Sequence, residues 1–266
     1  MNSILTSLGR RLAERLAQPT RQGTQVACAT PGMVAGALRP GDVLLVEGNT
    51  RVSAAIKYLT QSPWSHAALF VGDALGPQGP GVASGTLIEA DICEGVRSVP
   101  LSVYAGMHTR ICRPVGLSPS DLSKVIGYAV SRIGHKYDLK NLFDLARYLV
   151  PMLPVPVRWR RRMIAFGSGD PSRAICSTLI AQAFHSVHYP ILAEVTLLKT
   201  DDPAFHDCYR EFLHIRHYSL FTPRDFDISP YFQVVKPAVR HDFDYRRAIW
   251  EEDSPGSAET LATAAS

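Results

Sequence analysis

The chain has 266 residues, of which 46% are hydrophobic and 20% are charged, and its formal net charge is +4. This length and hydrophobic content suffice for the core of one sizeable domain. The small basic excess does not indicate nucleic acid as a partner, and we expect none. Five cysteines without regular spacing do not fit a disulfide framework, which favours a reducing compartment.

The N-terminal segment is predicted to be an amphipathic helix. Ile4 and four leucines follow helical spacing over residues 2–17, with arginines on the opposite side. The helix either packs on the domain or lies on an anionic membrane surface, and the basic cluster 158–162 around Trp159 favours the membrane. The same N-terminal arginines interrupt the apolar region of a secretory signal, and no stretch reaches the about 18 apolar residues of a membrane-spanning helix. We therefore expect a cytoplasmic protein, either free or peripheral to the membrane.

Composition divides the chain into three parts. Residues 18–37 are rich in Gly, Pro, Thr and Ala and predict a linker, so the first part, 1–37, is a helix followed by a linker. The catalytic domain is expected over 38–240. The remaining residues, 241–266, form a tail that becomes small, polar and aperiodic after residue 250, which predicts disorder at its end.

Short apolar runs bounded by turn residues predict five strands. They span residues 43–46, 65–71, 86–90, 96–99 and 109–113. Helices are predicted over 51–60, from the Ser118–Pro119 cap to residue 133, over 138–150, and from Cys176 onward, with an irregular basic loop at 151–170. Brief connections between the strands imply an antiparallel meander. Strands grouped apart from helices indicate an α+β fold.

Cys176 stands out by its position at the predicted start of a helix. A buried thiol is usually an ordinary small core residue. At a helix N-terminus, however, unpaired N–H groups and the helix dipole favour a thiolate, and the same N–H groups can stabilise an oxyanion. The sequence therefore predicts Cys176 as a nucleophile that needs a base beside it.

His66 is the best placed of the nine histidines to be that base. It lies on a predicted strand beside small alanines, and strand alternation puts His66, Ala68 and Phe70 on one face. A histidine on that face can meet the N-terminus of a helix laid across the sheet. The alternative is a core histidine held by one hydrogen bond.

Glu89 is the candidate for the group that orients the imidazole. It is a lone carboxylate within the next predicted strand, where a charge is unusual unless it is exposed or paired. Adjacent strands bring it within reach of His66, and Asp91 is the next candidate. The histidines lack the paired spacing of a zinc site, so we expect no metal and no cofactor.

These residues occur in an order that resembles a known family. The matching runs are 38–45, 65–72, 89–90, 134–138, 176–180 and 222–226. This order is similar to the circularly permuted branch of the NlpC/P60 papain-like superfamily, and within it to the YiiX/YebB-like group, of which lecithin:retinol acyltransferase-like enzymes are distant relatives. The resemblance implies a permuted papain-like fold in which an antiparallel sheet packs against the helix that bears Cys176.

The resemblance also implies an activity, which we state as an expectation. Cys176 attacks a carbonyl, His66 moves the proton and Glu89 orients His66, so that an amide or ester bond is cleaved through a thioacyl-enzyme. Ser65, Tyr137 and Ser177 are expected to contact a peptide-like or lipid and acyl substrate. Three functions stay open: an amidase or peptidase, a lipid-directed acyl hydrolase or acyltransferase at a membrane surface, and a catalytically silent binding module.

Overall fold

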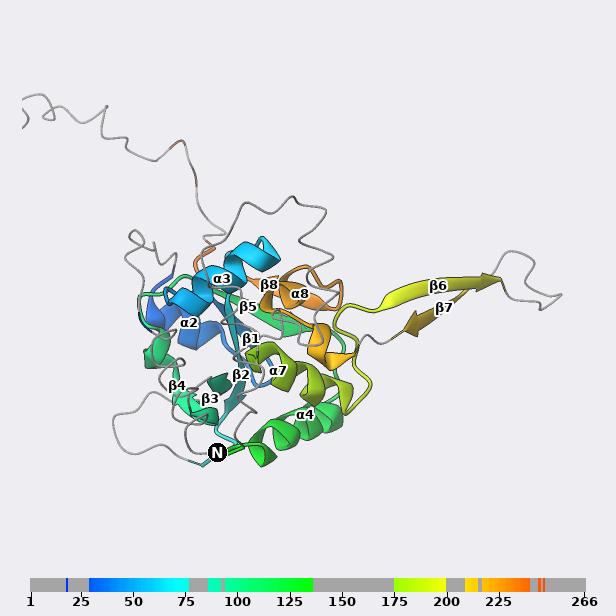
Figure 1. Ribbon diagram of the computed structural model, residues 1–266, viewed down its shortest axis with the longest axis horizontal. Coiled ribbons are helices and arrows are strands. Elements are labelled where there is room, and N and C mark those ends of the chain that lie inside the picture. The colour runs from blue at the N-terminus through cyan, green and yellow to red at the C-terminus, as the bar shows by residue number, and fades with distance from the viewer. Residues whose placement is uncertain are drawn as a thin grey trace, which may run out of the picture.

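The computed structural model of the protein describes residues 29–76, 86–91, 94–135, 175–199, 209–214 and 217–239, together with residues 18, 244 and 246. Its centre is a six-stranded antiparallel sheet in the order β4-β3-β2-β1-β5-β8 (Figure 1). The strands are β1 (Val43–Val46), β2 (His66–Gly72), β3 (Thr86–Asp91), β4 (Gly95–Pro100), β5 (Thr109–Pro114) and β8 (Phe232–Val235). A separate two-stranded sheet pairs β6 (Glu194–Lys199) with β7 (Tyr209–His214).

Helices accompany the sheet along the chain (Figure 1). The α-helices are α2 (Pro31–Ala37), α3 (Arg51–Thr60), α4 (Pro119–Ser131), α7 (Ile175–His185) and α8 (Pro223–Asp227), and the 3-10 turns are η1 (Leu101–Tyr104) and η2 (Tyr218–Leu220). Helix α4 begins as its sequence predicts, because the Ser118 side chain accepts a hydrogen bond from the Asp121 N–H at 3.1 Å and Pro119 occupies the first turn. These elements and the sheet confirm an α+β fold. None of the helices in the described ranges is long and apolar enough to cross a membrane.

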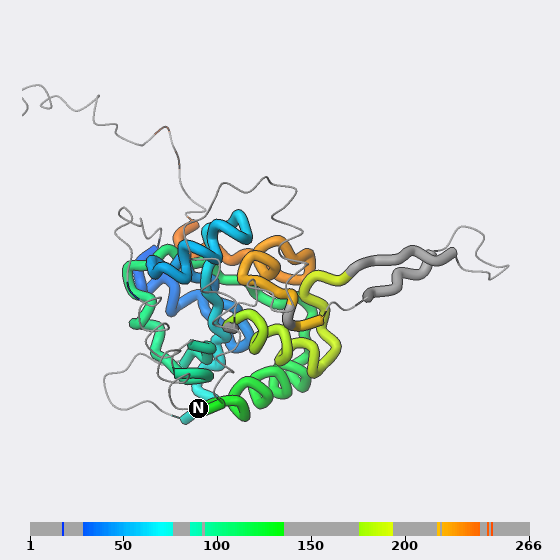
Figure 2. The backbone as a smooth tube through the Cα atoms, in the orientation of Figure 1, coloured from blue at the N-terminus to red at the C-terminus, as the bar shows by residue number. Residues whose placement is uncertain are grey.

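Two hydrophobic clusters cover the two faces of the sheet. The first contains Ala67, Leu69 and Val71 of β2 and the apolar side of α7, and α4 packs beside α7 (Figure 2). The second contains Ala68 and Phe70 and lies under α2 and η1. The predicted alternation of β2 is therefore confirmed. The body of α7 packs on the face of Ala67, Leu69 and Val71, opposite to that of Ala68 and Phe70.

The turn before β1 is held by a buried ion pair. Asp42 is 1% exposed, and its carboxylate accepts hydrogen bonds from Nε and Nη2 of Arg113 at 2.9 and 2.8 Å. The same carboxylate accepts from the N–H of Arg39 at 2.8 Å, and Gly41 between them has a φ of +91°, which favours glycine. This contact fixes the start of β1, the central strand beside β2.

One prediction is wrong and several concern residues outside the description. The linker expected over 18–37 contains helix α2, whose Val34 is 5% exposed within the second cluster. Two glycines give this seven-residue helix a low intrinsic propensity, so its stability comes from packing. The predicted helices over 2–17 and 138–150, the loop 151–170 and the tail after residue 250 lie outside the described residues.

Candidate active site

Three elements carry the predicted catalytic residues. His66 is the first residue of β2, Glu89 lies within the neighbouring β3, and Cys176 is the second residue of α7. Residues two apart on a strand share a face, so His66 and Glu89 lie on the face of the second cluster. Because His66 and Cys176 stand at the ends of their elements, they meet there although the body of α7 packs on the other face.

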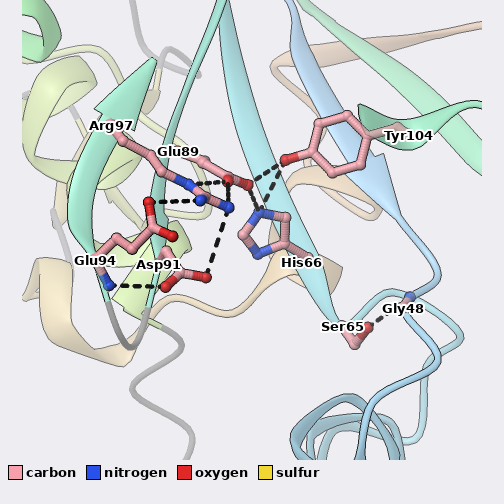
Figure 3. A network of polar contacts seen from close by, with 8 residues as sticks. All are labelled: Gly48, Ser65, His66, Glu89, Asp91, Glu94, Arg97 and Tyr104. Atoms are coloured by element: carbon pink, nitrogen blue, oxygen red, sulfur yellow. Dashed lines mark hydrogen bonds and ion pairs between the residues drawn. The ribbon is translucent and has the colours of Figure 1, made fainter. Parts of the chain in front are cut away.

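His66 and Glu89 form the closest polar contact of the site. Nε2 of His66 lies 2.5 Å from Oε2 of Glu89 (Figure 3). The hydroxyl of Tyr104, at the end of η1, donates a hydrogen bond to the same Oε2 and lies 3.1 Å from Nε2 of His66. The carboxylate is 4% exposed, whereas the His66 side chain is 24% exposed.

The other oxygen of Glu89 is held from β4. Nε and Nη2 of Arg97 both lie 2.8 Å from Oε1 of Glu89, directly across the β3–β4 pair (Figure 3). Arg97 also pairs with Glu94 at 2.8 Å and with Asp91 at 3.8 Å. Each oxygen of Glu89 thus has its own partners, Oε1 on the arginine side and Oε2 on the histidine side.

Cys176 contacts His66 from the other direction. The thiol is 4% exposed, and a side-chain hydrogen bond joins it to the imidazole. Since Nε2 of His66 is held by Glu89 and Tyr104, Nδ1 is the nitrogen left to face the sulfur. Burial lowers the pKa of His66, but the negative charges of Cys176 and Glu89 and their hydrogen bonds raise it to about 10.

The carboxylate of Glu89 is stabilised by its neighbours in spite of burial. Burial raises the pKa of Glu89, and the contacts with His66, Tyr104 and Arg97 outweigh it and lower the pKa to about 2. Burial and the charge of Glu89 raise the pKa of Tyr104, so the phenol keeps its proton. Glu89 is therefore ionised and Tyr104 neutral over the physiological range.

Two of the three predicted substrate-binding residues have structural partners. Ser65 is 2% exposed, and its hydroxyl accepts a hydrogen bond from the N–H of Gly48 at 2.9 Å (Figure 3). Ser177 is fully buried, and its hydroxyl donates to the carbonyl of Phe221 at 2.7 Å. Both hydroxyls therefore serve as structural hydrogen-bonding groups. Tyr137 lies outside the described residues.

The sequence reasoning missed Tyr104 and Arg97. Arg97 could have been found from the strand register, because pairing Asp91 with Gly95 places residue 97 opposite Glu89. Tyr104 gave no comparable signal. It enters the site from a four-residue 3-10 turn, and its ring also lines a mostly apolar pocket beside α2.

Comparisons with known proteins give one structural likeness to report. No family model matches the chain, and neither does any curated protein. The crystal structure of the metalloprotein yiiX from Escherichia coli O157:H7, DUF1105, is similar at 17% sequence identity with a TM-score of 0.43. The likeness covers 74% of this chain and 96% of that one.

The same comparison corrects one expectation. We expected no metal as a partner, and this is contradicted because the similar structure is that of a metalloprotein. In the part of this chain that the structure describes, no group of three or more His, Cys, Asp or Glu side chains is arranged to hold a metal ion.

Proposed function

We propose that the protein is a cysteine-dependent hydrolase in which Cys176 is the nucleophile, His66 the general base and acid, and Glu89 the group that orients His66. The observation that carries this proposal is the position of His66 between a thiol at a helix N-terminus and a buried carboxylate. A nucleophile, a base within hydrogen-bond reach and a third group that orients the base are the parts of this type of catalysis.

The first half of the reaction forms a thioacyl-enzyme. Before substrate binds, the proton of the Cys176 thiol rests on Nδ1 of His66, because the pKa of His66 is raised to about 10, and the sulfur then attacks the carbonyl carbon of the substrate. The N–H groups in the first turn of α7 stabilise the oxyanion of the tetrahedral intermediate. His66 then returns its proton to the departing amine or alcohol, and the carbon–heteroatom bond breaks.

The second half releases the acyl group. Water enters, and His66 removes its proton while the oxygen attacks the thioester carbon. The carbon–sulfur bond breaks, and the proton returns to the sulfur. Glu89 keeps its charge throughout, because the contacts of Tyr104 and Arg97 stabilise the carboxylate.

We also propose that the fold is the circularly permuted papain-like one of the NlpC/P60 superfamily. The strands with His66 and Glu89 come before the helix with Cys176 along the chain, and α7 packs against β2 and β3. This is the arrangement that the order of the sequence motifs implies, with the same catalytic groups reached in a permuted chain order.

The adduct on Cys176 distinguishes the substrate classes. Purified protein is incubated with a peptidyl ester, a peptidyl anilide or a long-chain acyl ester, and the intact mass is recorded with time. A peptidyl adduct on Cys176 supports the amidase or peptidase, and an acyl adduct alone supports the lipid-directed alternative. No adduct and no turnover with any probe overturns the enzymatic proposal in favour of the binding module. Cys112→Ala, which changes a cysteine outside the site, is the matched control for Cys176→Ala.

A further inference from the structure

We propose that Tyr104 is a positioning residue that shares Oε2 of Glu89 with His66 and so weakens the hold of the carboxylate on the imidazolium. The inference rests on the proposed function, because it concerns how readily His66 gives its proton to a leaving group. No sequence motif indicates Tyr104, whose role follows from the hydrogen bonds of the site.

The donors and acceptors around Oε2 can be counted. A phenol has one proton, and Tyr104 donates it to Oε2 of Glu89. Its oxygen can then only accept from Nε2–H of His66, which lies 3.1 Å away. Oε2 therefore receives two hydrogen bonds, one from His66 and one from Tyr104 (Figure 3). The imidazole proton in turn faces two acceptors.

Tyr104 acts on the acidity of His66 in two opposite ways. Its hydrogen bond to Glu89 makes the imidazolium more acidic, and its contact with Nε2 of His66 makes the imidazolium less acidic. The bond to Glu89 has a charged acceptor, so it lowers the basicity of the carboxylate strongly. The contact with His66 is longer, and its acceptor is a neutral oxygen. The net effect of Tyr104 is to make the His66 imidazolium a stronger acid.

The surroundings of Tyr104 hold the hydroxyl in place. The residue is 7% exposed, and its ring packs in the second cluster with Val34 of α2 and Leu87 of β3. The N–H of Met107 donates to the Tyr104 carbonyl at 3.1 Å, which fixes the end of η1. A phenol held this way needs no further ordering when the reaction begins.

In the part of the chain that the structure describes, the charged and titratable groups around His66 take part in this balance. Cys176 faces it from α7, Glu89 from β3 and Tyr104 from η1, and Arg97 of β4 acts through the far oxygen of Glu89. Of these groups, only Tyr104 contacts both Nε2 of His66 and Oε2 of Glu89. Tyr104 is thus placed to tune the pair without touching the substrate.

The test compares Tyr104→Phe with Tyr128→Phe in the full chain. Tyr128 lies on α4 and loses a hydroxyl that bonds Gln182, outside the site. The pKa of His66 is measured by NMR in the Cys176→Ala background, where removal of the sulfur charge brings the titration to a lower pH. We expect Tyr104→Phe to raise the pKa of both His66 and Glu89, whereas Tyr128→Phe leaves both unchanged. With Cys176 present, kcat falls about tenfold at constant KM.

A purely structural role for Tyr104 gives the opposite result. If the residue only packs, Tyr104→Phe leaves the pKa of His66 unchanged, or lowers it toward the ordinary value as the site loosens, and either result overturns the proposal. If Tyr104→Phe fails to fold, 3,5-difluorotyrosine at position 104 keeps the ring and strengthens the donor, and the pKa of His66 is then expected to fall. The pKa measurement by NMR needs no turnover, so it tests the role of Tyr104 separately from the proposed function. Failure of the proposed function would instead show as a wild-type Cys176 that forms no adduct.

Discussion

Oε2 of Glu89 lies 2.5 Å from Nε2 of His66, and this contact joins a buried carboxylate to an imidazole at the edge of the site. The contact links two adjacent strands, whereas the contact between His66 and Cys176 links the sheet to a helix more than a hundred positions later. The proposed chemistry depends on both contacts.

Glu89→Gln is expected to remove an acid-sensitive part of the stability. The folded state lowers the pKa of Glu89 from 4.5 to about 2. A lowered carboxyl pKa stabilises the fold above the unfolded value, and the stabilisation is lost as the pH falls from about 4.5 to about 2. At neutral pH it corresponds to about 3 kcal/mol.

The measurement is denaturant unfolding of the wild type and of Glu89→Gln at pH 7 and pH 3. The difference in unfolding free energy should be large at pH 7 and smaller at pH 3. A difference that stays the same at both pH values contradicts the assigned ionisation of Glu89.

Arg97→Gln is expected to raise the pKa of Glu89 while the His66–Glu89 contact remains. Arg97 holds only Oε1, so its loss removes one donor pair from the carboxylate and leaves Oε2 with His66 and Tyr104. The acid unfolding transition should then move to higher pH. Lys124→Gln, which breaks an exposed ion pair with Asp121, is the control and should leave the transition in place.

His66→Ala and Cys176→Ala are expected to act on turnover as one unit. Each single variant should reduce kcat to the background, and the double variant should cause almost no further loss, because neither residue works without the other. His108→Ala is the matched control, since His108 contacts Glu47 and the ring of Trp64 but not the site. Independent, multiplying losses for the two variants would mean that they do not share a step.

Local sequence patterns were sufficient to predict β2 and the start of α7. Alternation placed His66 and Ala68 on one face, and adjacent strands placed Glu89 within reach, as the structure confirms. Short-range pattern could not place α7, because which face of the sheet a helix covers depends on the apolar residues of all its neighbours. His66 meets the N-terminus of α7, as expected, while the body of the helix packs on the opposite face of the sheet.

The two partners of Glu89 that the sequence analysis missed also differ in whether local sequence could have predicted them. Arg97 follows from the register of one hairpin, which is local information. The position of Tyr104 depends on how α2 and η1 pack over the sheet, and the composition of the segment that forms α2 predicted a linker. Contacts made by short elements depend on tertiary packing, which cannot be predicted from a local stretch of sequence.

The reactivity of the Cys176 thiol tests the central proposal most directly. Cys112 is a built-in reference, because it is fully buried in β5 and burial raises the pKa of its thiol to about 12. The folded protein is treated with iodoacetamide, and the labelling rate of each cysteine is followed by peptide mass spectrometry in the wild type and in His66→Ala. We predict that Cys176 is labelled at least about tenfold faster than Cys112, and that His66→Ala removes most of this advantage. Labelling of Cys176 at the rate of Cys112, or at a rate that His66→Ala does not change, would contradict the assignment of Cys176 and His66 as nucleophile and base.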